Sequence, residues 1–211
     1  MSSQPNSWDA KYRDTRDEHA TAEPAAIVAE LLPLLARGPA LDLACGAGRH
    51  ALLLAAQGYL VTGVDGSAAA LEIAEQRGRA SGIHVRRKAN IGRPSHASIS
   101  GLELVQADLE SVTLPADSFD VILCVHYLQR SLFAQMERAL RPGGMLVFET
   151  FTRAHLEFGG GPRNPEFLLD SHELRNAFPT LRTIFYRELH AGKGIASLLA
   201  QRAWFRGSPS I

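Results

Sequence analysis

The chain has 211 residues, and its 22 basic residues balance its 22 acidic residues, so its formal net charge is zero. Hydrophobic residues make up 45% of the sequence and charged residues 21%, which is an ordinary globular composition. These values argue against a strongly basic nucleic-acid-binding protein, and no apolar run approaches the roughly 18 residues that a membrane span requires.

The first eighty residues alternate between helical and strand patterns. A helix is expected over 21–36, where apolar residues recur at helical spacing until a glycine-proline pair ends the pattern. Buried strands are expected over 40–44 and 59–64, and each leads into a helix, the first ending near Ala56 and the second near Ala80. Strands that alternate with helices in this way predict a parallel sheet covered on both faces.

The segment 82–101 shows no clear periodicity. It carries Arg86, Arg87, Lys88 and Arg93, followed by a proline and several small polar residues. Because connections longer than about 12–15 residues are uncommon in a compact domain, we interpret this segment as a solvated insertion. A basic patch that contacts a partner is the alternative interpretation.

Strand patterns return in the second half of the chain. Five further strands are expected over 102–106, 119–125, 145–151, 182–189 and 195–205. A helix is expected over 129–140, and Asp170 and Glu173 form a capping box for a short helix ending at Phe178. A glycine-containing turn separates the last two strands, which indicates an antiparallel hairpin. The sequence therefore predicts a three-layer α/β fold with a mostly parallel, seven-stranded sheet.

The clearest chemical signal is the turn DLACGAG at 42–48, where a strand runs into small residues and then a helix. Glycines at 46 and 48 let the backbone approach a ligand closely, and the helix start offers unpaired N–H groups. Asp65 lies at the end of the second strand, where a carboxylate can accept the hydroxyl hydrogens of a ribose. Asp108 ends the third strand. Open α/β sheets bind ligands at this carboxyl edge.

Two kinds of nucleotide cofactor fit such a site. The run GAGRHA at 46–51 matches the dinucleotide fingerprint, which favours an NAD- or FAD-dependent enzyme. The Asp42 carboxylate favours a different cofactor, because it would repel a pyrophosphate and attract the amino group of a methionine moiety. Asp108 is placed to accept a hydrogen bond from the amino group of adenine. The sheet is expected to end in an antiparallel hairpin and not in the second nucleotide-binding half of a dinucleotide-binding fold, which also argues against NAD or FAD.

At these positions the sequence resembles the class I S-adenosylmethionine-dependent methyltransferases. The runs ALDLACGAGRHALLLA at 40–55 and GYLVTGVDGS at 58–67 resemble the cofactor-binding half of that superfamily. Its later motifs are matched by ADL at 107–109, FDVI at 119–122 and RPGG at 141–144. The continuation GRH and the N-terminal WDAKY at 8–12 are similar to the subgroup related to the tellurite-resistance methyltransferase TehB.

The resemblance implies a Rossmann-like methyltransferase fold, S-adenosylmethionine as methyl donor, S-adenosylhomocysteine as product and no metal. It also implies a cofactor-binding role for the residues that match the motifs, namely Trp8, Tyr12, Asp42, Ala44, Cys45, Gly46, Gly48, Asp65, Gly66, Ala107, Asp108, Leu109 and Val125. Asp42 and the turn would hold the methionine end, Asp65 the ribose and Asp108 the adenine, while Trp8 and Tyr12 would form a lid. Ala44 departs from the family, which often has glycine there.

Candidate residues for the chemistry follow the fourth and fifth strands. His126 is the candidate catalytic base, with a histidine packed beneath the cofactor as the alternative. Tyr127, Arg130 and Arg153 are the candidate acceptor-binding residues, and the two arginines suit an anionic acceptor. The glycine- and proline-rich segment 158–167 is expected to cover the acceptor site.

These expectations combine into one domain over 1–211. It comprises a lid and helix at 1–38, a cofactor-binding core at 39–151 with the insertion 82–101, and a substrate cover with the hairpin at 152–211. The predicted function is methyl transfer to a small-molecule acceptor; an NAD(P)-dependent oxidoreductase and a non-catalytic S-adenosylmethionine-binding protein are the alternatives.

The remaining expectations concern the protein's surroundings. The two cysteines form no CxxC pair, and the first residues do not resemble a secretory signal, so we expect a reduced, cytoplasmic protein. We expect a monomer or weak homodimer that binds neither nucleic acid nor a membrane.

Overall fold

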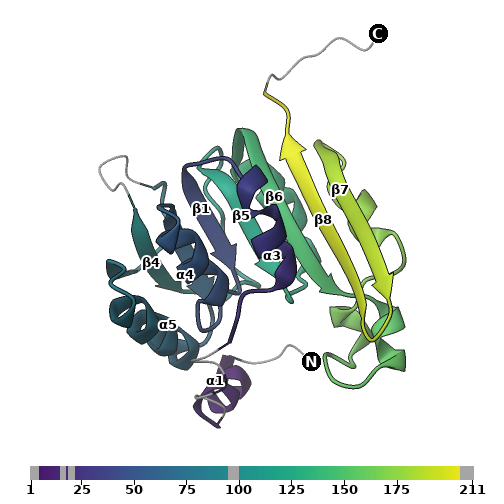
Figure 1. Cartoon of the computed structure of the whole chain (residues 1–211), viewed down its shortest axis with the longest axis horizontal. Coiled ribbons are helices and arrows are strands. Elements are labelled where there is room, and N and C mark those ends of the chain that lie inside the picture. The colour runs from purple at the N-terminus through teal and green to yellow at the C-terminus, as the bar shows by residue number, and fades with distance from the viewer. Residues whose placement is uncertain (1–4, 15–17, 19–21, 95–99, 205–211) are drawn as a thin grey trace.

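The computed structural model describes residues 5–14, 18, 22–94 and 100–204, and its centre is a single sheet (Figure 1). The strands found in these ranges are β1 (Pro39–Leu43), β2 (Leu60–Asp65), β3 (Val85–Lys88), β4 (Gly101–Gln106), β5 (Phe119–Val125), β6 (Leu140–Phe151), β7 (Leu181–His190) and β8 (Gly194–Arg202). Their spatial order is β3-β4-β2-β1-β5-β6-β8-β7. The six strands from β3 to β6 run parallel, and β8 and β7 continue the sheet in antiparallel pairing.

Helices cover both faces of this sheet. The helices α3 (Ala26–Leu31), α4 (Arg49–Ala56) and α5 (Ala68–Ala80) lie on the face turned toward the viewer in Figure 1. The helices α6 (Phe133–Ala139) and α7 (Glu173–Asn176) pack on the opposite face, and α1 (Pro5–Asp14) lies beside α5. Short 3-10 turns complete the chain as η1 (Leu32–Leu34), η2 (Arg130–Leu132), η3 (Arg153–Glu157) and η4 (Pro165–Phe167).

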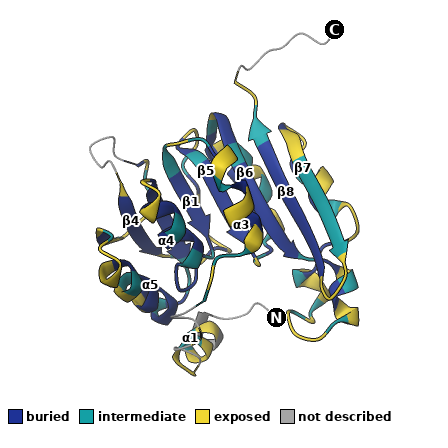
Figure 2. Ribbon diagram, viewed as in Figure 1, coloured by how far each residue is buried: buried dark blue, intermediate teal, exposed yellow. Residues whose placement is uncertain are grey.

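The central strands contribute side chains to two apolar clusters, one on each face. In β1, Leu41 and Leu43 join the cluster that contains Met136 of α6, whereas Ala40 joins the cluster that contains Ile27 of α3. This alternation follows from the two-residue side-chain period of a strand. Figure 2 shows β1, β5 and β6 as almost wholly buried. Burial on both faces leaves the carboxyl ends of the strands as the place where polar groups gather.

The predicted mostly parallel sheet with a C-terminal hairpin is confirmed, but the sheet has eight strands among the described residues rather than seven. The additional strand is β3, inside the segment 82–101 that we expected to be an insertion. It pairs with β4 at the sheet edge, where Lys88 lies 3.0 Å from the carboxylate of Glu103 and Arg86 also pairs with Glu103. Only Val85 of this strand is buried, so the sequence shows no hydrophobic pattern from which the strand could be predicted.

The predicted helix over 21–36 is much shorter in the structure. It begins at Ala26 and its α-helical part ends at Leu31, after which Pro33 forms part of the 3-10 turn η1. Proline has no N–H to donate to the preceding turn, so it breaks the helical ladder. Thr21, the expected cap, lies outside the described residues, as does Phe205 at the expected end of the last strand. No helix in the described ranges is long and apolar enough to cross a membrane.

Candidate active site

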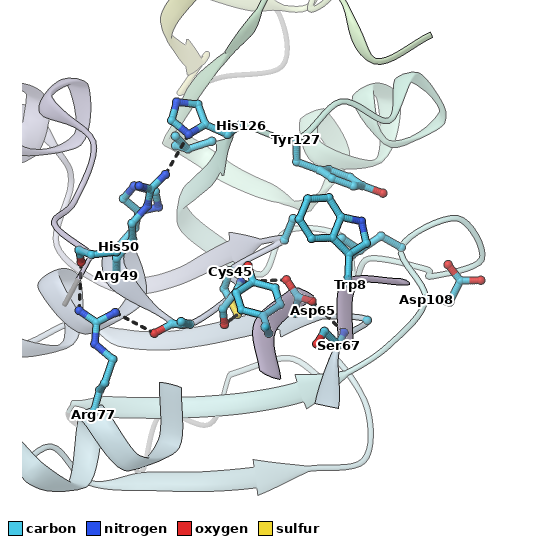
Figure 3. A pocket seen from close by; sticks show the side chains of 18 of the residues that line it. Trp8, Cys45, Arg49, His50, Asp65, Ser67, Arg77, Asp108, His126 and Tyr127 are labelled. Atoms are coloured by element: carbon cyan, nitrogen blue, oxygen red, sulfur yellow. Dashed lines mark hydrogen bonds between the residues drawn. The ribbon is translucent and has the colours of Figure 1, made fainter. Parts of the chain in front are cut away.

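A cavity of about 340 Å³ lies at the carboxyl edge of the parallel strands (Figure 3). Its walls come from the turn after β1, the ends of β2 and β5, the segment after β4, and the helix α1. The lining residues are Trp8, Tyr12, Ala22, Ala44, Cys45, Gly46, Ala47, Arg49, His50, Asp65, Gly66, Ser67, Arg77, Asp108, Leu109, Glu110, Val125, His126 and Tyr127. The structure therefore brings together most of the residues that the sequence predicts for a cofactor site.

The turn after β1 is built from residues with left-handed backbone conformations. Ala44, Gly46 and Gly48 have φ values of 55°, 52° and 78°. A Cβ atom on Gly46 would lie 2.3 Å from the hydroxyl of Tyr12, and one on Gly48 would lie 2.9 Å from the Cβ of Ala74 in α5. Gly46 thus allows Tyr12 to pack closely against the turn, whereas Gly48 serves the packing of two helices and does not line the cavity.

Asp65 fixes this turn to the end of β2. Its Oδ2 accepts a hydrogen bond from the N–H of Gly46 at 2.8 Å, and its Oδ1 accepts one from the N–H of Ser67 at 2.8 Å. Burial raises the pKa of Asp65, and the two backbone donors oppose that shift. The carboxylate is therefore held in one orientation by the backbone, at the edge of the cavity.

Asp42 lies in β1 beneath the turn and does not line the cavity. Its side chain is 1% exposed, and its Oδ2 finds no hydrogen-bond partner among the described residues. Burial raises the pKa of Asp42 to about 7, while a backbone hydrogen bond from Ala51 and the charge of Arg49 oppose the shift. An unsatisfied buried carboxylate oxygen is rare, and it suits a cationic group bound nearby.

The helix α1 forms one side of the cavity. Asp9 accepts hydrogen bonds from the Ser67 hydroxyl and, at 3.2 Å, from the N–H of Ala69 at the start of α5. A carboxylate at a helix N-terminus is stabilised by the exposed N–H groups and the helix dipole. Trp8 and Tyr12 of this helix line the cavity. Burial, followed by the charge of Asp65, raises the pKa of Tyr12, so its hydroxyl stays protonated.

The segment after β4 forms the wall where adenine was expected. Asp108 and Leu109 both line the cavity, whereas the adjacent Ala107 does not. The Oδ1 of Asp108 accepts the N–H of Glu110 at 2.9 Å, which orients this carboxylate too. Asp108 and Asp65 therefore share one feature, a carboxylate positioned by backbone donors at a strand end.

On the side of the cavity opposite Asp108, His126 is bound to Arg49 (Figure 3). The Nη2 of Arg49 lies 2.9 Å from the Nδ1 of His126. Since a guanidinium can only donate, Nδ1 must accept, and the neutral ring carries its proton on Nε2, 3.8 Å from an oxygen of Glu149. Burial and then the charge of Arg49 lower the pKa of His126 to about 4. The lone pair that a base would use at Nδ1 is thus engaged.

Two predicted acceptor residues lie outside the cavity. Arg130 pairs with Glu173 at 2.6 Å and also donates to the carbonyl oxygens of Glu166 and Leu168. Arg153 pairs with Asp170, and only Tyr127 of the three acceptor candidates lines the cavity. No residue of the segment 158–167 lines it either.

Sequence reasoning missed several lining residues: Ala22, Arg49, His50, Ser67, Arg77 and Glu110. Arg49 and His50 stand in the GRH run that carries the resemblance, so their position was a usable signal. No sequence signal points to Arg77, because this residue lies toward the far end of α5 and donates to the carbonyl oxygens of Ala47 and Ala22. No group of three or more His, Cys, Asp or Glu side chains in the described part of the chain is arranged to hold a metal ion.

The curated relatives that this chain matches include two O-methyltransferases. The ubiquinone biosynthesis O-methyltransferase of Pasteurella multocida is 30% identical over 118 residues, which cover 54% of this chain and 46% of that protein. The malonyl-[acyl-carrier protein] O-methyltransferase of Paenibacillus sp. is 30% identical over 172 residues, which cover 77% and 56% of the two chains. The chain spans about half the length of the curated relatives it matches.

Solved structures share the fold. TehB from Haemophilus influenzae superposes with a TM-score of 0.66 at 17% identity, over 94% of this chain and 66% of that one. An S-adenosylmethionine-dependent methyltransferase from Mesorhizobium loti gives a TM-score of 0.62 at 23% identity, over 84% and 98%. Residues 41–148 match the family described as "Methyltransferase domain". That stretch contains the turn, Asp65 and Asp108, and the chain therefore belongs to the methyltransferase domain family.

Proposed function

We propose that this chain is an S-adenosylmethionine-dependent methyltransferase that acts on a small-molecule acceptor. The observation that carries the proposal is the Asp65 carboxylate, which two backbone N–H groups fix at the end of β2 against a cavity of about 340 Å³. A carboxylate in this place is suited to both hydroxyl groups of a ribose. Membership of the methyltransferase domain family supports the same conclusion.

The residues present fit the methyl donor. Gly46 lines the cavity without a side chain, and the acids around the cavity favour a cation over a pyrophosphate. Asp65 and Asp108 would hold the adenosine portion, with Trp8 across it, and the unsatisfied oxygen of Asp42 lies beneath the turn that would hold the methionine end. When bound, the donor supplies a methyl group already activated by a positively charged sulfur.

The protein's own contribution is to bind, orient and exclude water. The lid residues Trp8 and Tyr12 cover the cavity, and Leu109 and Val125 give it apolar walls. Orientation of two reactants in such a site contributes up to about 7–11 kcal/mol to the barrier reduction. The lid and the apolar walls therefore support a reaction that depends on alignment.

We propose that His126 positions Arg49 and does not act as the general base. Its Nδ1 accepts from Arg49, and its ring stacks on Phe151 with centroids 5.1 Å apart. Tyr127 stays a candidate acceptor contact because it lines the cavity. We leave Arg130 and Arg153 out of the proposed acceptor site because both are paired elsewhere.

A reducing, cytoplasmic environment also forms part of the proposal. Cys45 and Cys124 are both free and buried, and burial raises the pKa of each thiol, which makes both unreactive. We propose a monomer or weak homodimer without a nucleic-acid partner, in line with the zero net charge.

Thermal denaturation with S-adenosylhomocysteine or with NADH tests the proposed cofactor. A ligand at 100 times its dissociation constant should stabilise the fold by about 2.7 kcal/mol, and we expect this from S-adenosylhomocysteine alone. Stabilisation by NADH without any by S-adenosylhomocysteine would instead support an oxidoreductase. Transfer of a labelled methyl group to acceptors of several classes then separates an enzyme from a protein that only binds the cofactor.

A further inference from the structure

The guanidinium of Arg49 makes few interactions with the described residues of the protein. It is the first residue of α4 and lines the cavity, and its one hydrogen bond among the described residues goes to Nδ1 of His126. It makes no ion pair with any described carboxylate. Because a guanidinium offers five N–H donors, most of its donors are available to a ligand.

Arg77, the other arginine that lines the cavity, is bound to the protein in a different way. Arg77 donates to the carbonyl oxygens of Ala47 and Ala22, and so serves the structure of the turn. Arg49 instead reaches away from the turn, toward the end of β5. In Figure 3 the Arg49–His126 pair and Asp108 lie on opposite sides of the pocket.

Among the residues that the structure describes, no acid forms an ion pair with Arg49. Glu149, behind His126, is buried, accepts the Ser197 hydroxyl at 2.6 Å, and lies 3.9 Å from Arg187. Asp42 interacts with Arg49 only through space, from its buried place in β1. On the far side, the charge of Lys193 acts on His126 in the same direction as that of Arg49. Asp65, Asp108 and Glu110 also line the cavity, but the direct partner of Arg49 is the neutral ring of His126. A cation without a carboxylate in contact favours an anionic ligand.

Resting on the proposed function, we infer that the methyl acceptor is a small carboxylate or oxyanion, and that Arg49 binds its negatively charged group beside the end of β5. Bidentate recognition by a guanidinium suits either kind of anion. The donor's own carboxylate has the same chemistry, and the experiment below distinguishes the two sources.

An anionic acceptor also explains why the site offers His126 only in a neutral, engaged form. A lone pair on the acceptor oxygen forms the new bond to the methyl carbon while the carbon–sulfur bond breaks, and that electron pair remains on sulfur. The negative charge of the acceptor and the positive charge of the sulfonium cancel. No proton moves, so the reaction needs no general base.

The test uses the full chain saturated with S-adenosylhomocysteine and titrated with anions by calorimetry. Benzoate, malonate and sulfate are compared with their neutral counterparts benzamide, malonamide and dimethyl sulfone. The proteins are wild type, Arg49→Gln, Arg49→Lys, and Arg182→Gln as an exposed control on β7. Melting temperatures establish that each variant is folded.

We expect at least one anion to bind wild type about tenfold or more tightly than its neutral counterpart. Arg49→Gln should lose that preference, whereas Arg49→Lys and Arg182→Gln should keep most of it. The affinity of Arg49→Gln for S-adenosylhomocysteine should change by less than about threefold.

Three results would overturn the inference while leaving the proposed function intact. They are no preference for any anion in wild type, a preference that persists in Arg49→Gln, and a tenfold loss of S-adenosylhomocysteine affinity in Arg49→Gln. The last result would assign Arg49 to the carboxylate of the donor. Failure of wild type to bind S-adenosylhomocysteine at all would instead overturn the proposed function and the inference together.

Discussion

On the side of the pocket at the ends of β2 and β4, acidic side chains are held by backbone N–H groups, whereas on the side at the end of β5 a cation is held by one neutral histidine. Asp65 and Asp108 accept from the backbone at 2.8–2.9 Å. Arg49 donates to His126 and forms no ion pair within the described residues. Both sides present charge to the cavity, but only the first has its charge positioned by the backbone.

This difference separates two tasks. Carboxylates oriented by the backbone form a fixed template, as a site for one invariant cofactor requires. A guanidinium with free donors adapts to ligands of different shape, which suits an acceptor. The comparison therefore supports our proposal that the donor binds the acidic side and the acceptor the basic side.

The largest expected effect comes from the acidic side. Asp65→Ala removes charged hydrogen bonds and should weaken S-adenosylhomocysteine binding by about 1.5–3 kcal/mol, as measured by calorimetry. Glu72→Gln, which removes an exposed carboxylate from α5, should leave the affinity unchanged. An unaltered affinity in Asp65→Ala would remove this residue from the donor site.

The pH dependence of stability tests the buried base next to this turn. His50 accepts the N–H of Ala25, and burial lowers its pKa to about 3. An unfolded histidine takes up a proton as the pH falls through about 6.5, whereas His50 stays neutral in the fold. Stability is therefore present above pH 6.5 and is lost as the pH falls below that value.

His50→Gln should reduce this loss between pH 6.5 and 5 by about 1–2 kcal/mol in urea denaturation. The raised pKa of Asp42, about 7, acts in the opposite direction, because acidification below pH 7 favours its protonated folded form. That contribution is common to both proteins and cancels in the comparison. Identical pH dependence would show that the pKa of His50 is the same in the folded and unfolded protein, which contradicts this account.

A smaller effect is expected on the basic side. His126→Gln should lower methyl transfer to an anionic acceptor by less than about tenfold, since a positioning residue is lost, whereas loss of a general base typically costs about 10²–10⁴-fold. The pH–rate profile should show no inflection that disappears with His126. The exposed His172→Gln provides the control. A hundredfold loss, together with a lost inflection, would restore His126 as the base.

The smallest effect is expected at the lid. Asp9→Asn weakens the contact of α1 with the start of α5, and should lower S-adenosylhomocysteine affinity by about 0.5–1 kcal/mol. Hydrogen exchange in α1 should rise in this variant, and Asp14→Asn, an exposed change in the same helix, should not raise it. Equal exchange in the two variants would show that Asp9 does not hold the lid.

The sequence predicted the acidic side better than the basic side, for a physical reason. Asp65 ends β2 and Asp108 follows the end of β4 by two residues. Both strands are marked by apolar runs, so the shared edge follows from the order of elements. The edge strand β3 was missed because Arg86 and Lys88 find their acidic partner on β4 and leave no hydrophobic pattern.

On the basic side, pairings between distant parts of the chain decide each role. Arg130 was predicted to bind the acceptor, but it pairs with Glu173, 43 residues away. Arg49 was passed over, although it reaches His126, 77 residues away, inside the cavity. Such partners depend on how loops and helices pack together, which spacing along one sequence does not reveal.

A crystal structure with S-adenosylhomocysteine tests the division of the pocket most directly. The ribose should lie on Asp65, the adenine should lie near Asp108 and Trp8, and Arg49 should remain on His126 without contacting the ligand. A structure in which Arg49 binds the carboxylate of S-adenosylhomocysteine, or in which the adenosine lies away from Asp65, would contradict this account.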